Sequence, residues 1–596
     1  MSTFGKRQRP DEIDKHQLPT SLSTPISPPR KSRRLDAGHH KSPWQLTWVR
    51  DLPEELNRDA VTLSDILGDP LISECWEFNF LHDVGFLMDA FDPDTRHLVD
   101  VHVVHGFWKR DDPQRRALSL SASAYNNVKL HVAPMPEMFG THHSKMLVLF
   151  RHDDTAEVIV HTANMIPKDW TNMTNAVWRS PRLPRSAKEI PTSSASTPYE
   201  DLGIGSGHRF QADLISYLRS YDRRAVTCGP LADRLSRYDF SAVRAALITS
   251  VPGVHDVNDV SCTPFGWAAM RRYLGAVPCE QGSSEVVIQI SSIATLGGKD
   301  TWLQKTLLDS FVSSRTRSTT RPKFKIVFPT ADEIRRSLDG YASGGSIHTR
   351  IQSAQQMQQL HYLRPILYHW ANDCDDGAAL PRDVAVQNGG RKRAAPHVKT
   401  YIRYNENRTL DWAVLTSANL SKQAWGEAAK PTGEMRIASW EMGVLIWPEL
   451  LEENASMVAS FPSDSLGQLN LPAEADAASV ALRIPYSLPL QRPLGCFDGS
   501  YGTGLSRSVV GRVSTSEKGK MKMKKGKMKK AAEKRNREDM YKRHRQQNIM
   551  GVPGPNTAVM NKVNIKSRAH VVTHGRRAEI STTDNAAPCH VDFMAA

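Results

Sequence analysis

Two stretches of this chain decide its fold: HSKMLVLF, at His143–Phe150, and HVKTYIRY, at His397–Tyr404. Each opens with His-x-Lys and continues as an apolar, strand-like run. In both, a short polar turn follows, and a second apolar run ends in Ala-Asn, at Asn164 and Asn419. The Lys-to-Asn spacing is 19 residues in the first copy and 20 in the second, and a Trp follows each Asn by six positions. The chain therefore contains an internal repeat of a strand hairpin.

The repeat predicts that six polar side chains meet. Residues i and i+2 of a strand point to one face, so the His and the Lys of each triplet share a face. The hairpin returns the Asn to the same end of the sheet. If the two copies pack about a pseudo-twofold axis, these side chains converge on one site: His143, Lys145, Asn164, His397, Lys399 and Asn419. A third triplet, from His39 to Lys41, lacks the hairpin, so the triplet alone carries little information.

Such a cluster suits a phosphodiester. Two ammonium groups and two amide donors can clamp a phosphoryl group and neutralise the charge that develops on it. The repeated motifs contain no carboxylate to hold Mg²⁺ or Ca²⁺, so we expect a reaction with no metal and no cofactor. One neutral imidazole can attack phosphorus while the other, protonated, donates to the leaving oxygen. The lysines should oppose protonation of both imidazoles. The alternative is that each His is an ordinary hydrogen-bonded residue at a strand end.

The length of 596 residues exceeds what one hydrophobic core usually supports, which favours two domains with tails. Strand-like and helix-like segments alternate, as they do in α/β domains. We expect a disordered basic arm at 1–44, a first α/β domain at 45–252, a second at 253–495, and a disordered tail rich in Gly, Ser and Lys at 496–596. The two domains should be similar, because each holds one copy of the repeat.

Apolar runs and one amphipathic segment predict individual elements. We expect strands at 99–107, 145–150, 157–163, 285–293, 324–329, 401–404 and 412–418. We expect helices at 209–221 and at 351–370, the second bent near Pro365 because proline removes a helical hydrogen bond.

The net charge of +14 is concentrated in the tails. The arm carries +5 and residues 518–545 carry +11, whereas residues 45–517 sum to −4. Affinity for a polyanion should therefore come from the tails, while the body relies on a local basic groove. The segment PPRKSRR, at Pro28–Arg34, is either a nuclear import signal or a solvated basic linker.

The seven cysteines are scattered and form no C-x-x-C pair. This pattern predicts free thiols in a reducing compartment and argues against a zinc cluster. The chain has no apolar run of about 18 residues and no signal peptide, so we expect a protein that neither spans a membrane nor is secreted.

At these motifs the chain resembles the phospholipase D superfamily and, within it, the tyrosyl-DNA phosphodiesterase family. The general superfamily motif has an Asp five residues after the Lys, where this chain has Phe150 and Tyr404. The tyrosyl-DNA branch uses a later Asn, which Asn164 and Asn419 match. The resemblance covers about residues 45–493 and includes the neighbouring segments MFGTHHSKM, VLTSANLSKQAWG and SWEMGVL.

The resemblance implies two similar phospholipase D-like α/β domains with the active site at their interface. It implies a nuclear, monomeric enzyme of DNA repair that hydrolyses the bond between a DNA 3′ phosphate and a topoisomerase-derived tyrosine, and other blocked 3′ ends. Its partners would be single-stranded or nicked DNA ends, with double-stranded DNA as a further option and no membrane. The alternatives are a general nuclease or lipid phosphodiesterase of the superfamily, and a non-catalytic protein that binds DNA ends.

The resemblance also implies a role for each site residue. His143 matches the nucleophile that forms a phosphohistidine, and His397 matches the general acid that later activates water. The phosphate clamp is matched by Lys145, Lys399, Asn164 and Asn419. Glu441 matches the residue that orients the nucleophile. Asn175 stands in the place of a Gln that orients the second His, and its shorter side chain predicts contact through water.

Four further residues match contacts to DNA. Phe80 and Phe139 match positions near the bound DNA end, where a ring could stack on a base; the equal alternative is that both are core aromatics. Ser292 and Ser421 match contacts to DNA phosphates. The family's closing Asp-x-Pro-Trp segment is absent from this chain. Either the second domain lacks an element or the C-terminal sequence derives from an aberrant gene model.

Overall fold

The computed structural model describes most of the chain between Gly38 and Arg492. The described residues are 38–186, 198–223, 226–316, 320–349, 352–373, 386–466 and 478–492. Most of the expected arm, with the Pro28–Arg34 segment, lies outside the described residues, as does the whole expected tail at 496–596.

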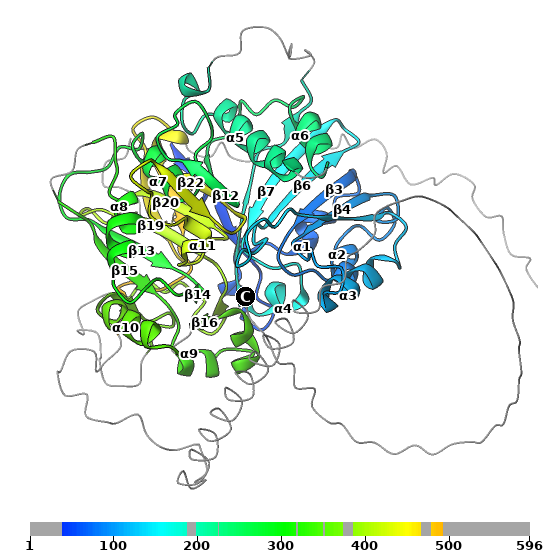
Figure 1. Cartoon of the computed structure of the whole chain (residues 1–596). Helices are drawn as coiled ribbons and strands as arrows, with labels where there is room; N and C mark the ends of the chain where they lie inside the picture. The colour runs from blue at the N-terminus through cyan, green and yellow to red at the C-terminus, as the bar shows by residue number, and fades with distance from the viewer. Residues whose placement is uncertain are drawn as a thin grey trace, which may run out of the picture. The chain divides into compact units, whose positions relative to one another are not determined.

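The first main sheet has eight strands and contains the first hairpin at its centre (Figure 1). Its order is β2-β9-β7-β6-β3-β4-β5, with β10 beside β7. The strands are β2 (Trp44–Leu46), β3 (Ile72–Phe78), β4 (Asp100–His105), β5 (Val128–Val132), β6 (Met146–Arg151), β7 (Thr155–His161), β9 (Ala176–Arg179) and β10 (Leu183–Pro184). Strands β3, β4 and β5 are parallel, and β6 and β7 form the antiparallel hairpin. The three strands expected in this part of the chain are thus confirmed as β4, β6 and β7.

The second main sheet has ten strands and contains the second hairpin. Its order is β1-β24-β23-β20-β19-β13-β15-β17, and β22 joins β20 to β11. The strands are β1 (His39–His40), β11 (Ala246–Ser250), β13 (Glu285–Gln289), β15 (Lys323–Val327), β17 (Leu367–Tyr368), β19 (Thr400–Tyr404), β20 (Thr409–Thr416), β22 (Glu441–Ile446), β23 (Ser456–Ser460) and β24 (Ser479–Arg483). Three short two-stranded sheets are formed by β12 (Gly253–Asp256) with β21 (Glu434–Ile437), β14 (Ser292–Ile293) with β16 (His348–Thr349), and β8 (Met173–Thr174) with β18 (Ala395–Pro396).

The two sheets repeat one topology. The order β2-β9-β7-β6-β3-β4-β5 in the first corresponds to β11-β22-β20-β19-β13-β15-β17 in the second. The directions also correspond, because both series end in three parallel strands and all their other pairings are antiparallel. The similarity expected from the repeated hairpin therefore extends to seven strands. Strand β11 precedes the expected boundary at 252, so the second sheet begins inside the segment that we assigned to the first domain.

Strand β6, the first strand of the first hairpin, is buried on both faces. Met146, Val148 and Phe150 join the larger hydrophobic core, which includes α5 and α7. Leu147 and Leu149 face the other way and join a smaller core with α1, α2 and α3. A strand covered on both faces has no solvent side, which explains why β6 is a continuous apolar run. The same alternation leaves polar residues only at the strand ends, where His143 and Lys145 precede β6.

The helices are α1 (Leu63–Leu67), α2 (Val84–Asp89), α3 (Pro113–Ala122), α4 (Pro167–Thr171), α5 (Gly207–Arg219), α6 (Gly229–Leu235), α7 (Gly266–Leu274), α8 (Leu308–Ser310), α9 (Ala331–Arg335), α10 (Ala354–Leu363) and α11 (Lys422–Trp425). The helix expected at 209–221 is confirmed as α5 and the short 3-10 turn that follows it. The bent helix expected at 351–370 is wrong. Helix α10 ends at Leu363, because Pro365 cannot continue it, and the chain passes through a 3-10 turn into strand β17.

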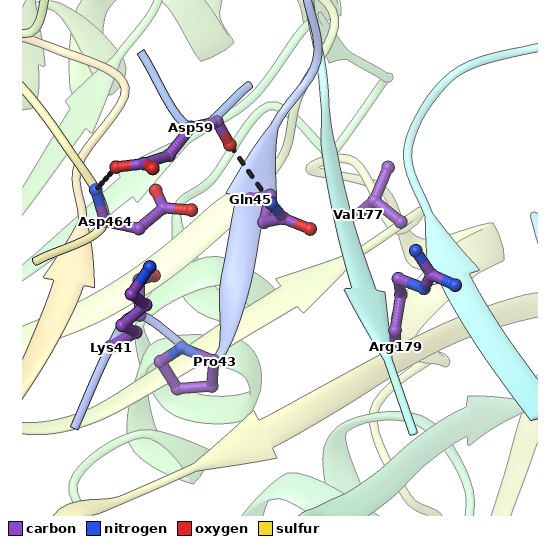
Figure 2. A pocket seen from close by; sticks show the side chains of 8 residues that line it. Lys41, Pro43, Gln45, Asp59, Val177, Arg179 and Asp464 are labelled. Carbon is purple, nitrogen blue, oxygen red and sulfur yellow. Dashed lines mark hydrogen bonds between the residues drawn. The ribbon is translucent and has the colours of Figure 1, made fainter. Parts of the chain in front are cut away.

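The segment at 38–46 connects the two sheets, so the disorder that we expected up to residue 44 does not hold for its last residues. Strand β1 pairs with β24 of the second sheet, and β2 pairs with β9 of the first. A pocket of about 160 Å³ lies beside this segment. Figure 2 shows side chains that line it. In it, Gln45 Nε2 donates to the carbonyl of Asp59, and the amide of Asp464 donates to the Asp59 carboxylate at 3.0 Å. The amide of Ser42 also donates to the carbonyl of Asp464 at 2.8 Å, so the segment is bonded to residues of both halves.

Two further expectations concern the environment of the protein. Among the described helices, none combines the length and the apolar character needed to cross a bilayer. Four cysteines lie in the described residues, and all four are free thiols: Cys75, Cys228, Cys262 and Cys279.

Candidate active site

The two motifs occupy equivalent places in the two sheets. In the first half, the carbonyl of Lys145 accepts a hydrogen bond from the amide of His161, at 3.1 Å. In the second half, the carbonyl of Lys399 accepts one from the amide of Thr416, also at 3.1 Å. In each half, the hydrogen bonds between the two strands of the hairpin therefore extend as far as the Lys of the His-x-Lys triplet. The geometry explains why both triplets lie at the end of a buried strand.

The difference of one residue between the two Lys-to-Asn spacings is a β-bulge. Strands β6 and β7 pair without interruption from Met146 to Phe150. Between β19 and β20 the register shifts at Arg403, which pairs with Trp412, while the next residue pairs with Leu410. Asp411 is the extra residue, and its carboxylate forms an ion pair with Arg403 at 2.9 Å. The bulge lies far along the strands, so the catalytic ends of the two hairpins still correspond.

Each motif is hydrogen-bonded to the opposite half. The amide of His143 donates to the carbonyl of Trp440 at 3.0 Å, and the amide of His397 donates to the carbonyl of Thr174 at 2.9 Å. The residues that follow these two acceptors are Glu441 and Asn175. Glu441 and Asn175 are thus structurally equivalent. The two imidazoles are brought to one interface, as the repeat predicted.

Glu441 holds the imidazole of His143. Its Oε2 accepts a hydrogen bond from His143 Nδ1 at 2.9 Å, and another from Ser417 Oγ at 2.5 Å. Burial alone would raise the pKa of Glu441, but its partners, above all His143, lower it overall. Because the carboxylate can only accept, Nδ1 carries the hydrogen and Nε2 keeps its lone pair. This is the contact that the resemblance implied.

The contact of His397 differs from the expectation in two ways. Asn175 Oδ1 lies 3.3 Å from His397 Nδ1, so the amide reaches the ring directly and not through water. Asp169 Oδ2 lies closer, at 3.0 Å from the same nitrogen. Asp169 was not predicted from the sequence, and the expectation of a constellation without a carboxylate is wrong. The available signal was an asymmetry of the repeat: Asp169 follows Asn164 by five positions, where the second copy has an alanine.

Asp169 links the second imidazole to the phosphate clamp. Its side chain is fully buried, and its Oδ2 also accepts a hydrogen bond from the amide of Asn164 at 2.7 Å. Burial alone would raise the pKa of Asp169, but the charge of His397 and its hydrogen bonds lower the pKa overall. The group is therefore a carboxylate. Each imidazole thus has one carboxylate on Nδ1, and none of the described residues forms a hydrogen bond with its Nε2.

The two lysines are fully buried and make the same contact. Lys145 Nζ donates to the carbonyl of His143 at 3.0 Å, and Lys399 Nζ donates to the carbonyl of His397. Burial lowers the pKa of Lys145 to about 8. Burial also lowers the pKa of Lys399, and repulsion from Lys145 lowers it further. The charge of Lys145 therefore reaches Lys399, and an anion bound beside the two ammonium groups would stabilise both charges.

Both imidazoles are neutral near pH 7. Burial lowers the pKa of His143 to about 4, although Glu441 opposes the shift. Burial lowers the pKa of His397 to about 3, although Asp169 opposes it. Repulsion from Lys145 and Lys399 contributes to the lowering in both cases. The prediction that the lysines oppose protonation of the imidazoles is confirmed, and each lysine acts on the imidazole of the other half as well.

The side-chain oxygen of Asn419 is fully engaged by the neighbouring loop. Its Oδ1 accepts three hydrogen bonds, from the amide of Ser291 at 3.1 Å, from Ser291 Oγ at 3.1 Å and from the amide of Ser292 at 3.0 Å. The side-chain oxygen is therefore occupied as an acceptor, and the side-chain nitrogen, Nδ2, is the atom that can donate. Ser421 lies two residues further on, and its hydroxyl accepts from the amide of Ala424 at the start of α11. The Ser421 hydroxyl hydrogen therefore stays free to donate.

The two aromatic residues named for DNA contact are not core residues. The ring of Phe80 is half-buried, and its centroid lies 5.6 Å from that of His143. The side chain of Phe139 is 68% exposed. Neither ring belongs to the hydrophobic cores of the described residues. The alternative that both are core aromatics is wrong.

The site can perform nucleophilic displacement at phosphorus. Two imidazoles offer Nε2 atoms from opposite halves, two lysines supply positive charge, and the side-chain amide of Asn419 can donate. The carboxylates of Glu441 and Asp169 are engaged by imidazole Nδ1 atoms.

Comparisons with known proteins agree with this site. A family model described as "Tyrosyl-DNA phosphodiesterase" matches residues 43–492. The "Probable tyrosyl-DNA phosphodiesterase" of Schizosaccharomyces pombe is 30% identical over 489 residues, which cover 72% of this chain and 86% of that protein. "Tyrosyl-DNA phosphodiesterase 1" of Arabidopsis thaliana is 28% identical over 496 residues, which cover 77% and 74%.

The fold also matches a solved structure. The crystal structure of the yeast tyrosyl-DNA phosphodiesterase superposes with a TM-score of 0.53 at 20% identity, over 75% of this chain and 96% of that chain. The likeness confirms the expected fold of two phospholipase D-like α/β halves. With the family model covering both motifs and the interface between them, this chain belongs to the tyrosyl-DNA phosphodiesterase family.

Proposed function

We propose that this protein hydrolyses the phosphodiester bond between a DNA 3′ phosphate and a tyrosine derived from a topoisomerase, and acts on other blocked 3′ ends. The observation that carries the proposal is the pair of imidazole–carboxylate contacts, His143 with Glu441 and His397 with Asp169. Each leaves one Nε2 free, so one imidazole can attack while the other transfers a proton. The names of the relatives supply the substrate class.

In the first step, His143 Nε2 attacks phosphorus as the bond to the tyrosine oxygen breaks. His397, carrying a proton on Nε2, donates it to the departing phenolate. The empty site favours neutral imidazoles, but the negative charge of the bound phosphate raises the pKa of His397, and Asp169 stabilises its imidazolium. The products of this step are free tyrosine and DNA joined to His143 through a phosphorus–nitrogen bond.

In the second step, the now neutral His397 removes a proton from water, and the water oxygen attacks phosphorus. The phosphorus–nitrogen bond breaks, and DNA with a 3′ phosphate leaves while His143 returns to its neutral form. Throughout, Lys145, Lys399 and the two asparagines neutralise the charge on the phosphoryl oxygens. The side chains perform the neutralisation for which other phosphodiesterases use a metal ion.

The DNA strand would extend from this clamp over Ser292 and Ser421, with Phe80 and Phe139 near the terminal base. We propose single-stranded and nicked DNA 3′ ends as substrates, double-stranded ends as a further class, and a nuclear monomer as the working form. The basic segment Pro28–Arg34 would serve import into the nucleus.

The superfamily alternatives fit less well. A general phospholipase or nuclease pattern requires an Asp where this chain has Phe150 and Tyr404. Phe150 is fully buried in the core, and the Tyr404 hydroxyl shares a hydrogen bond with that of Tyr486 at 3.0 Å. Neither position could hold a charged carboxylate without a large cost of burial. A non-catalytic DNA-end-binding protein would not need both imidazole–carboxylate pairs.

The test is a gel assay with a 3′-phosphotyrosyl oligonucleotide and a chelator in the buffer. The expected products are free tyrosine and an oligonucleotide ending in a 3′ phosphate. The same oligonucleotide with a plain 3′ hydroxyl serves as the control for nuclease activity. Equal degradation of both, or cleavage that needs an added divalent cation, would favour the nuclease alternative. Binding without any cleavage would favour the non-catalytic one.

A further inference from the structure

One tryptophan differs from the other twelve in its exposure to solvent. All thirteen lie in the described residues, and Trp108 is the one whose side chain is exposed, at 53%. An exposed indole costs free energy in water and offers a large flat surface to a partner. The position of this ring in the fold indicates which partner.

Trp108 lies close to the nucleophile in the fold. It follows strand β4, and the preceding Gly106 is pressed against His142, the neighbour of His143. A Cβ on Gly106 would lie 2.5 Å from the Cβ of His142, so only glycine permits this approach. The loop that begins at Gly106 therefore leaves the sheet beside the catalytic motif.

The loop that carries Trp108 has a fixed backbone. The carbonyl of Trp108 accepts a hydrogen bond from Arg115 Nη1 at 3.0 Å. The amide of Phe107 donates to His105 Nδ1 at 3.1 Å, and Asp112 caps helix α3 through the amide of Gln114. The exposed ring is therefore held on an ordered support, which reduces the entropy that binding would cost.

Three aromatic residues follow neighbouring strands of the first sheet. Strands β3, β4 and β5 are parallel, so their carboxyl ends meet at the same edge. The chain after β3 carries Phe80, the chain after β4 carries Trp108, and the chain after β5 carries Phe139. Phe80 is the ring beside His143. The loop of Trp108 thus leaves the sheet at the same edge as the loop of Phe80, next to the nucleophile.

The charge around Trp108 fits a polyanion. Lys109 Nζ lies 5.4 Å from the centroid of the Trp108 ring. Arg110 and Arg116 are exposed on the same loop and on helix α3, and the basic residues of 109–116 outnumber the two acidic ones, Asp111 and Asp112. A flat ring flanked by cations suits a nucleobase with its phosphate, because bases stack on aromatic side chains and the backbone is neutralised by Lys and Arg.

We infer that Trp108 is a stacking site for a nucleobase of the substrate DNA, with Lys109 beside the adjoining phosphate. The inference rests on the proposed function and deepens it: the enzyme recognises an extended DNA end and not the 3′-terminal nucleotide alone. Trp108 acts on binding of the DNA. It takes no part in the chemistry at phosphorus.

The test compares Trp108→Ala, Trp108→Phe and the control Leu98→Ala. Leu98 is 66% exposed and precedes the amino end of the same strand β4, at the opposite edge of the sheet. The substrates are a 3′-phosphotyrosyl oligonucleotide and a single nucleotide with a 3′-phosphotyrosine. We expect Trp108→Ala to raise KM for the oligonucleotide about tenfold with kcat unchanged. Trp108→Phe should retain most of the affinity, and Leu98→Ala and the single nucleotide should show no change.

Two results would overturn the inference. One is an unchanged KM for the oligonucleotide in Trp108→Ala. The other is a loss that grows with the length of a peptide attached to the tyrosine, which would place the ring on the leaving group. Binding of a plain oligonucleotide with a 3′ phosphate, followed by fluorescence anisotropy, separates this inference from the proposed function. Weaker binding by Trp108→Ala supports the stacking site even if wild type lacks turnover, and equal binding refutes it.

Discussion

Asp169 Oδ2 lies 3.0 Å from His397 Nδ1, and no carboxylate occupies the corresponding position of the second repeat. In the other half, the carboxylate on the imidazole comes from Glu441, whose structural equivalent is Asn175. The two halves thus reach the same imidazole–carboxylate contact from different places in the repeat. The two imidazoles therefore have the same kind of carboxylate contact, although the residues that supply the carboxylates are not equivalent in the repeat.

Removal of each imidazole in turn should have a different effect on the reaction. We expect His143→Ala to abolish turnover, because no nucleophile remains to form the phosphorus–nitrogen bond. We expect His397→Ala to let a covalent DNA adduct accumulate, because the water that releases DNA is no longer activated. The adduct would be measured as a shifted band on a denaturing protein gel with labelled DNA. Unchanged activity of His397→Ala with no adduct would refute the assignment of the two roles.

Asp169→Asn should slow proton transfer by His397. The variant keeps the shape of the side chain but removes the charge that stabilises the imidazolium, so we expect kcat on a tyrosyl substrate to fall on the order of 10²-fold. A p-nitrophenyl ester has a leaving group that needs no proton. With it, we expect a rapid burst of one equivalent followed by slow turnover, because only the second step still requires His397.

Asn175→Ser provides the comparison. It removes the longer contact at 3.3 Å and the bond from Asn175 Nδ2 to the Asp169 carbonyl, but it keeps the Asp169 carboxylate and its bond from the Asn164 amide. Its loss of kcat should be smaller than that of Asp169→Asn. A larger loss in Asn175→Ser would show that the amide, and not the carboxylate, orients His397.

Stability should fall in mild acid through a pair of histidines outside the site. His102 Nδ1 and His131 Nε2 lie 2.9 Å apart, and the His102 ring stacks on Trp76. Burial, with repulsion from His131, lowers the pKa of His102 from 6.5 to about 4. The unfolded chain therefore binds more protons between these two values, and stability is lost as the pH falls from about 6.5 to about 4.

The measurement is urea unfolding of wild type and His102→Gln at pH 7 and pH 5. After an allowance for solvent screening, the wild type should lose about 1–2 kcal/mol more than the variant over this interval. His97→Gln, at an exposed position, serves as the control and should behave as wild type. An equal loss in wild type and His102→Gln would remove the histidine pair as the cause.

The basic segment at 518–545 should govern the salt dependence of DNA binding. It carries +11, and its residues lie outside those that the structure describes. We expect its deletion to weaken DNA binding and to reduce the slope of log Kd against log salt, because fewer counterions are released. Turnover at saturating substrate should stay unchanged. An unaltered salt slope in the deletion variant would contradict this prediction.

The repeated hairpin with its His, Lys and Asn was determined by the sequence alone. Alternation along a strand is a local property, so His143 and Lys145 had to share a face, and the matching turn and Asn164 had to follow. The resemblance added Glu441, which the structure places at His143. The bulge at Asp411 is the exception within the hairpins. Its only sign in the sequence is a Lys-to-Asn spacing that is longer by one residue in the second copy.

Only the tertiary structure decided which groups meet across the interface. Asp169 and His397 are 228 positions apart and belong to different halves, so no local period connects them. The same holds for the segment at 38–46, which looked like part of a polar arm but pairs with strands of both sheets. The exposure of Trp108 likewise depends on which neighbours pack against its loop. Strand faces and turns follow from short-range sterics, whereas contacts between halves and solvent exposure arise only when the chain is packed.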